Sequence, residues 1–198
     1  MCIKYDYFDT FVFMVENSCS AFELLKNSLV EYNTNKVKRN LDEIDKLVRQ
    51  SEKEKQILIE KLDKEFIAPI EKVDIIEIAQ RIIKLTYSIE DGLNMICSCD
   101  LASVRCDLLL LVQINESCCL KLKDVIKEFR NFKKSKMFNK NLALFNRVLD
   151  KGRKNYNQVI YRCNITNKSL NHIQEFKKIL DSIIELAFII ERAIINNT

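Results

Sequence analysis

The sequence contains very few of the residues that end helices and build tight turns. In 198 residues glycine occurs twice, as Gly92 and Gly152, and proline once, as Pro69. So few of these residues cannot build the turns of a β-sandwich or the glycine-rich loops that cradle phosphate groups. Because 47% of the residues are hydrophobic and 30% are charged, the chain has the composition of a folded protein. We expect long helices joined by a few polar connections.

Histidine is almost absent as well, since His172 is the single one in the chain. Catalysis by a Ser-His or Cys-His pair would depend on this residue, which falls near the start of a predicted helix, and no oriented base accompanies it. The sequence also lacks the Glu-x-x-His pairs of di-metal helical bundles. It therefore predicts no catalytic residues and no cofactor, and the chain is not expected to be an enzyme.

Long apolar runs are missing too. The densest one, Leu108 to Val112, is far shorter than the ~20 apolar residues that a membrane-spanning helix requires. The first residues show no basic segment followed by an apolar one, so no signal peptide is predicted. We expect a cytoplasmic protein, with at most peripheral contact at the inner face of the membrane.

The eight cysteines include no Cys-x-x-Cys pair of the kind that builds structural zinc sites. In a reducing compartment a cysteine behaves as a small hydrophobic residue, and this is the expected role. A metal or redox role is the alternative. The eight positions are Cys2, Cys19, Cys97, Cys99, Cys106, Cys118, Cys119 and Cys163.

Apolar residues recur three and four positions apart in six consecutive segments. These run over residues 8–29, 37–62, 75–96, 104–132, 142–163 and 173–194. Residues at this spacing share one helix face, and a sustained period of this kind favours nearly parallel helix packing. The pattern predicts an all-α fold, an elongated up-and-down bundle of about six helices of about 25 to 30 residues each.

Breaks between the segments are also visible. Pro69 ends the second helix because proline displaces the residue before it from the helical region, and Asp74 is the expected N-cap of the third. The other predicted breaks are residues 32–35, Gly92 with residues 97–100 at the end of the third helix, 133–140 and 164–167. No linker divides the chain, so one domain over residues 1–198 is predicted.

Basic residues are concentrated between Lys121 and Lys154. This segment contains twelve basic and three acidic residues, while the whole chain has a net charge of only +4. Such a region can dock on phosphate groups or on an acidic protein face, although a solvated surface explains it equally well. The candidate docking residues are Lys133, Lys134, Lys136 and Lys140. Nucleic acid is not an expected partner, because the nearby aromatic residues fall mostly on the core seam.

Three segments resemble the PhoU-like regulators, in particular the short branch associated with Pit-type phosphate transporters. They are LDKEFIAPIEKVDI at 62–75, YFDTF at 7–11 and IIERAI at 189–194. The proline turn of the first segment is the most specific of them. The resemblance implies a PhoU-like helical bundle that regulates phosphate transport.

In that family, carboxylate pairs four residues apart on four helices hold metal clusters. The corresponding pairs in this sequence are Val48 with Glu52, Ile83 with Tyr87, Leu149 with Arg153, and Lys177 with Asp181, followed by Glu185. Only Glu52 and Asp181 keep a carboxylate. Since clustered carboxylates repel one another without a cation, their replacement by apolar and basic residues predicts that no metal site remains.

The resemblance thus implies a non-catalytic regulator of phosphate transport that contacts a transporter, or its signalling partner, at the membrane. One alternative is an eroded PhoU-like paralogue that serves as a structural or adaptor bundle. Another is a metal-binding protein that uses the cysteines. Self-association stays open, because bundles of this shape often pair through exposed helix faces.

Overall fold

The structure, a computed structural model, describes residues 5–98, 105–165 and 171–198. These residues form six long helices and one short 3₁₀ turn. The elements are α1 (Tyr7–Val30), α2 (Thr34–Lys64), α3 (Lys72–Ser98), α4 (Arg105–Glu128), η2 (Phe129–Asn131), α5 (Lys136–Ile165) and α6 (Asn171–Asn196). The predicted all-α bundle of six helices is confirmed.

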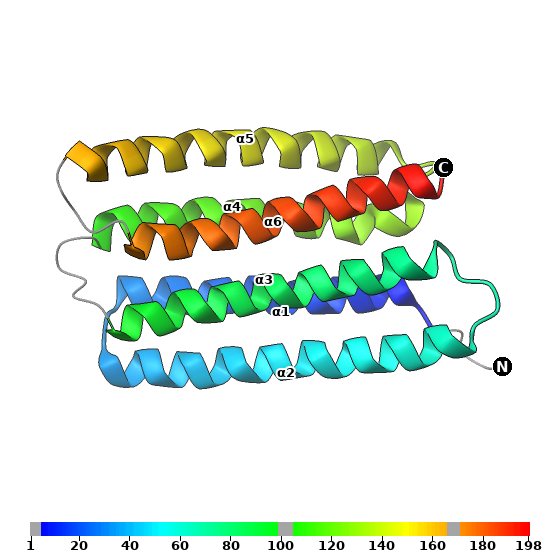
Figure 1. Cartoon of the computed structure of the whole chain (residues 1–198), viewed down its shortest axis with the longest axis horizontal. Helices are drawn as coiled ribbons and strands as arrows, with labels where there is room; N and C mark the ends of the chain where they lie inside the picture. The colour runs from blue at the N-terminus through cyan, green and yellow to red at the C-terminus, as the bar shows by residue number, and fades with distance from the viewer. Residues whose placement is uncertain (1–4, 99–104, 166–170) are drawn as a thin grey trace.

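The helices lie side by side in an up-and-down arrangement (Figure 1). Two pairs, α1 with α3 and α4 with α6, form the two central layers and pack against each other. Helix α2 covers α1 and α3 on one side, and α5 lies outside the other pair. The bundle therefore consists of two three-helix halves, α1–α3 and α4–α6, that meet along their central layers.

The core is made by the predicted apolar seams. Every predicted seam residue of α3 from Ile75 to Ile96 is buried, and the same holds for nearly all those of the other helices. Polar members of the seams find partners inside the core. The hydroxyls of Ser18 and Thr86 share a hydrogen bond of 2.8 Å across α1 and α3. Such pairing removes the penalty of burying a hydroxyl group.

Short polar side chains begin the first two helices. The Asp6 carboxylate accepts the backbone N–H groups of Phe8 and Asp9, and the Asn33 side chain accepts those of Asn35 and Lys36. Both caps satisfy backbone donors that have no partner inside the helix. The break predicted at residues 32–35 is therefore real but shorter, since α2 begins at Thr34.

The prediction that Asp74 is the N-cap of the third helix is wrong. Helix α3 begins two residues earlier, at Lys72, so that Asp74 lies inside its first turn. Its side chain is only 1% exposed. Arg192 lies 3.4 Å from the carboxylate, and the side-chain amides of Asn196 and Asn197 donate to it at 3.3 and 3.0 Å. Asp74 therefore anchors the end of α6 to the start of α3.

Three other boundaries differ from the prediction. Helix α2 ends at Lys64, five residues before Pro69. Helix α5 already begins at Lys136, so most of the predicted break at 133–140 is helical. Gly92 lies inside α3 and faces Ile179 of α6, where an added Cβ would be 3.2 Å from the isoleucine Cδ1. Gly92 is therefore a close-packing position and not a helix end.

Within the described residues, no helix combines the length and apolar content needed to cross a bilayer.

Candidate docking surface

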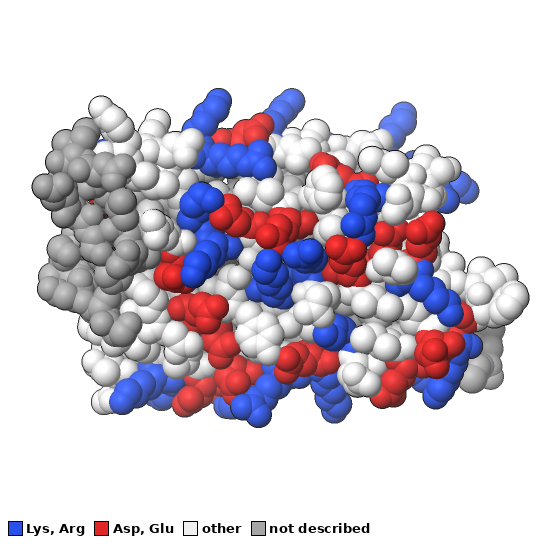
Figure 2. All heavy atoms as spheres, in the orientation of Figure 1, with Lys and Arg blue, Asp and Glu red and all other residues white. Residues whose placement is uncertain are grey.

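The outward face of α5 has a line of basic side chains. Five exposed basic residues follow one another at helical spacing, so that they fall within about 60° of one helix face. The residues that α5 buries, among them Phe145 and Tyr156, lie on the opposite face. We call the five residues the α5 basic stripe: Lys136, Lys140, Arg147, Lys151 and Lys154. Figure 2 shows Lys and Arg side chains projecting along this outer edge of the bundle.

The stripe is not neutralised by neighbouring carboxylates. Helix α5 contains one acidic residue, Asp150, and its ion pair is with Arg153, at 3.4 Å. Arg162 pairs with Asp107 of α4 at 3.6 Å. None of the five stripe residues forms an ion pair with any other residue that the structure describes. The stripe thus presents five positive charges to solvent over about 27 Å of helix.

The basic residues at the end of α4 and in η2 are in a different situation. Lys127 pairs with Glu16 of α1 at 2.8 Å, and this hydrogen bond raises the pKa of Lys127. Arg130 pairs with Asp9 and lies 3.3 Å from the carboxylate of Asp6. The predicted basic segment from Lys121 to Lys154 is therefore split. In its first part Lys127 and Arg130 bond to the N-terminal half of the bundle, whereas in its second part only Arg153 has an ion pair among the described residues.

The four predicted docking residues lie together at one end of the stripe. Lys136 and Lys140 are its first two members, and Lys133 and Lys134 are exposed in the turn just before α5. The ammonium of Lys133 lies 5.6 Å from the ring centroid of Phe132, in cation–π contact. The remaining stripe residues, Arg147, Lys151 and Lys154, belong to the predicted basic segment but are not among the four predicted docking residues, although spacing at 100° per residue aligns them with Lys136 and Lys140.

The same end of the bundle exposes two large apolar side chains. Phe66 and Ile67, in the connection between α2 and α3, are 96% and 73% exposed. Pro69 of this connection lines a surface depression of about 400 Å³ together with Lys133 and Lys134. The basic turn and the apolar connection are therefore neighbours. An exposed apolar patch rimmed by polar residues is typical of an interaction site.

Helix α5 approaches α4 closely at Gly152. A Cβ at this position would lie 3.1 Å from Cγ2 of Ile114 and 3.4 Å from the sulfur of Cys118. Only a glycine fits here without displacing its neighbours. This close approach fixes the inner face of α5 and so keeps the stripe directed outward.

A buried polar group joins α5 to both of its neighbours. The Tyr156 hydroxyl donates to the backbone carbonyl of Phe176 in α6 at 2.7 Å. The amide nitrogen of Asn115 in α4 donates to the Tyr156 hydroxyl at 2.9 Å and to the same carbonyl at 3.0 Å. Burial raises the pKa of Tyr156, so that it remains a donor. Oδ1 of Asn115 is buried and accepts no hydrogen bond in the described part of the chain.

The positions that correspond to metal-binding carboxylates lie in ordinary contacts. Val48, Ile83 and Leu149 are buried in the core. Glu52 accepts a hydrogen bond from Tyr87, which raises the tyrosine pKa to about 12.

On α6, Lys177 pairs with Asp181 at 2.7 Å. Glu185 pairs with Arg81 and Lys84 of α3 at 2.7 and 2.6 Å. Across the described residues, no group of three or more His, Cys, Asp or Glu side chains is arranged to hold a metal ion. The side chain of His172 lies outside the described ones.

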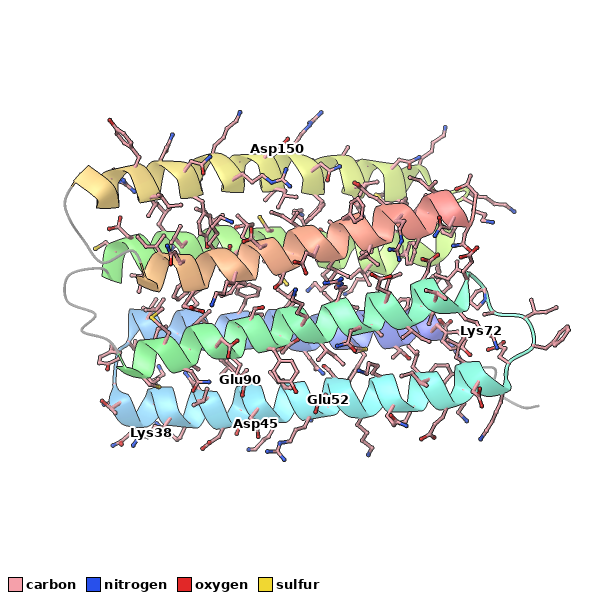
Figure 3. The ribbon with its side chains drawn as sticks, in the orientation of Figure 1. Lys38, Asp45, Glu52, Lys72, Glu90 and Asp150 are labelled. Atoms are coloured by element: carbon pink, nitrogen blue, oxygen red, sulfur yellow. The ribbon has the colours of Figure 1, made fainter. Side chains whose placement is uncertain are left out.

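Between α2 and α3 several carboxylates lie close together. Figure 3 shows Asp45 and Glu52 of α2 and Glu90 of α3 on the same side of the bundle. Partial burial, and then the nearby carboxylates of Asp45 and Asp91, raise the pKa of Glu90. Carboxylates are thus crowded around Glu90, whereas the outer face of α5 has a line of basic residues.

Comparison with known proteins identifies the fold. No family model and no curated protein matches the sequence. A crystal structure of a PhoU-like protein from Shewanella oneidensis MR-1 matches with a TM-score of 0.72 and 12% sequence identity, over 94% of each chain. The described residues thus have a PhoU-like fold, while the low identity leaves the function to be inferred from the surface.

Proposed function

We propose that this chain is a non-catalytic regulator of phosphate transport. Its α5 basic stripe and the adjacent turn would dock on an acidic surface of a phosphate transporter, or of the transporter's signalling partner, at the membrane. The observation that carries this proposal is the stripe itself: five exposed basic residues aligned on one helix face, with no ion pair to any described residue. The fold of the PhoU-like protein from Shewanella oneidensis MR-1 supports the regulatory class.

The charge distribution explains why docking suits this helix. Charges of one sign on a surface attract an oppositely charged partner and speed its association. They also favour one orientation, because the stripe runs along the helix axis and begins beside the basic turn, whose Lys133 and Lys134 share a surface depression with Pro69 of the apolar connection. The basic residues would speed association with the partner and orient the complex, and Phe66 and Ile67 would add apolar contact area.

The test compares two charge-reversed proteins. One has Lys136→Glu, Lys140→Glu and Arg147→Glu in the stripe. Its matched control has Lys38→Glu, Lys53→Glu and Lys61→Glu, three exposed lysines of α2, the outer helix of the other half. We expect the stripe variant to lose binding to membranes prepared from the cells that encode the chain. The control should bind like the unmodified protein. Equal binding of the two variants would remove the stripe from the proposal.

The same variants test the link to phosphate. Deletion of the gene should change the rate of labelled phosphate uptake, and the control variant should restore that rate whereas the stripe variant should not. An unchanged uptake rate after deletion would overturn the phosphate role. If the deletion leaves uptake unchanged but the stripe variant still loses membrane binding, the result favours the alternative hypothesis, a structural or adaptor bundle that does not regulate phosphate transport. Binding to protein-free vesicles of phosphatidylglycerol and phosphatidylcholine would show that lipid, and not a transporter, is the partner.

A further inference from the structure

Two cysteines from different halves of the bundle lie in contact. Cys19 of α1 and Cys119 of α4 are 100 residues apart in the chain, and their sulfur atoms are 3.5 Å apart. The neighbouring Cys118 is buried against α5 instead, near Gly152. Cys97 and Cys106 are exposed, and Cys2, Cys99 and Cys163 lie outside the described side chains. Cys118 fits the predicted role of a small hydrophobic residue, and the contact of Cys19 with Cys119 calls for another explanation.

The cysteine pair lies beside an open pocket. Cys19 and Cys119 line a surface cavity of about 470 Å³ between α1 and α4. Its wall includes Lys123 and the ion pair of Lys26 with Glu116, at 2.9 Å. Cys19 is partly exposed, whereas Cys119 is buried. A small polar reagent can therefore enter the pocket and reach Cys19 first.

The surroundings make the two thiols unequal. The hydrogen bond from the Cys119 thiol lowers the pKa of Cys19. The positive charges of Lys123 and Lys127 also lower it, whereas partial burial and the carboxylate of Glu16 raise it, and the net effect is a lowered pKa. The same hydrogen bond, followed by burial, raises the pKa of Cys119. A thiolate is the nucleophilic form of cysteine. Cys19 is thus the attacking sulfur, and Cys119 is the protonated neighbour held beside it.

We propose that Cys19 and Cys119 form a site of reversible oxidation by hydroperoxides, in which a disulfide joins α1 to α4. A disulfide requires sulfur atoms about 2.05 Å apart, so the two atoms would have to approach by about 1.5 Å. We expect rotation of the two side chains, which are already in contact, to supply this movement.

The reaction proceeds in two steps. The Cys19 thiolate attacks one oxygen of the hydroperoxide and the O–O bond breaks. The departing alkoxide takes up a proton as an alcohol; with hydrogen peroxide, the departing hydroxide takes up a proton as water. Cys19 is then a sulfenic acid. The Cys119 sulfur attacks the Cys19 sulfur, the S–O bond breaks, and the hydroxyl leaves as water with the proton of the Cys119 thiol. Two thiols lose two electrons in total, and the hydroperoxide is reduced to an alcohol and water, or to two waters when it is hydrogen peroxide. A small thiol reductant reverses the bond by exchange.

The position of the bond gives it a structural effect. Helix α1 belongs to the first three-helix half and α4 to the second, so the disulfide would link the two halves covalently at their shared layer. The site does not involve α5. This inference is therefore independent of the docking surface and would survive its failure.

Peptide mapping tests the proposal directly. After treatment with hydrogen peroxide and digestion with trypsin without reductant, we expect the peptide of residues 5–26, which contains Cys19, to be linked to that of residues 106–121. The second peptide contains Cys106, Cys118 and Cys119, so single-cysteine substitutions are needed to show which of the three is linked to Cys19. The link should persist in Cys106→Ser and Cys118→Ala proteins and fall to background in Cys119→Ala. Dithiothreitol should remove it.

A second measurement follows the first step alone. In the Cys119→Ala protein the sulfenic acid at Cys19 has no thiol to attack it, so a dimedone probe should label Cys19. We expect labelling about tenfold above that of the more exposed Cys97 and Cys106, since reactivity follows the thiolate fraction and not exposure alone. A linked peptide in Cys119→Ala, no linked peptide in the unmodified protein, or stronger labelling of Cys97 than of Cys19 would each overturn the proposal.

Discussion

The two outer helices, α2 and α5, hold corresponding places in the two halves of the bundle and are attached differently. Helix α2 lies in the groove between α1 and α3 and packs evenly on both, whereas α5 packs on α4 and barely touches α6. The two helices also differ in their balance of basic and acidic residues. Helix α2 has nine basic and seven acidic residues, and α5 has seven basic and one acidic. The helix with two supporting neighbours is balanced in charge, and the helix with one supporting neighbour is strongly basic.

Polar contacts sharpen the difference. Those of α2 are spread along its length: Asn40 donates to Ser28 at 2.8 Å, and Asn17 donates to Ser51 at 3.0 Å. The fully buried polar contacts of α5 gather at Tyr156, and Asn141 adds a half-buried one by donating to the Asp124 carbonyl of α4 at 3.1 Å. A helix held at many points resists the loss of any one of them. Helix α5 has its closest packing at Gly152 and its fully buried hydrogen bonds at Tyr156, so it depends strongly on both residues, and its outer face remains available to a partner.

The largest expected effect follows from filling the close contact of α5. Gly152→Val places methyl groups where even a Cβ lies 3.1 Å from Ile114, so α5 must move away from α4. We expect a loss of about 2 to 3 kcal/mol in the free energy of unfolding, measured by urea denaturation. The control Ala143→Val, at an exposed position of the same helix, should lose a few tenths of a kcal/mol. Equal losses in the two variants would contradict the close packing of α5 on α4.

A smaller effect is expected from the buried hydroxyls. Tyr156→Phe leaves the Asn115 amide and the Phe176 carbonyl without the tyrosine hydroxyl, and should cost about 2 kcal/mol. Ser51→Ala removes the acceptor of Asn17 between α2 and α1, and should cost about 1 kcal/mol.

Thermal unfolding of the two proteins measures the difference between the outer helices. A larger loss in Ser51→Ala than in Tyr156→Phe would reverse the comparison and make α2 the helix that depends on a single group.

The smallest effect concerns the crowded carboxylates between α2 and α3. Because the folded protein raises the pKa of Glu90, it holds more protons there than the unfolded chain does, and stability falls as pH rises through the interval between the two pKa values. Glu90→Gln should remove this dependence and stabilise the protein at neutral pH by about 0.5 kcal/mol or less. Melting temperatures measured from acidic to neutral pH test this, with Glu23→Gln on α1 as an exposed control. A lower melting temperature of Glu90→Gln at neutral pH would show that the carboxylate stabilises the fold.

The helices could be predicted from the sequence because their information is local. Each seam repeats within one segment, and the number of helices and the buried faces follow from it. The errors at Asp74 and Gly92 have a different origin. Both residues have local preferences, for a cap and for a helix end, that are overruled by contacts with α6. Such contacts link residues about 90 to 120 positions apart, and no local pattern reveals them.

The same limit applies to the candidate surface. The sequence identifies the basic segment, and helical spacing suffices to align the stripe. It does not show that Arg130 lies against Asp6 and Asp9, 121 residues from the latter. That Lys127 and Arg130 are paired across the two halves while the α5 basic stripe is not appears only when the halves are brought together.

The anchoring of Asp74 sets an order of events during synthesis. Its partners Arg192 and Asn197 follow it by 118 and 123 residues. At about 5 to 20 residues per second, a ribosome needs about 6 to 25 seconds to deliver them. During this time the first three helices can assemble while the Asp74 carboxylate is still hydrated. The first turn of α3 is therefore made in the first half of synthesis but is among the last parts of the chain to reach its final contacts.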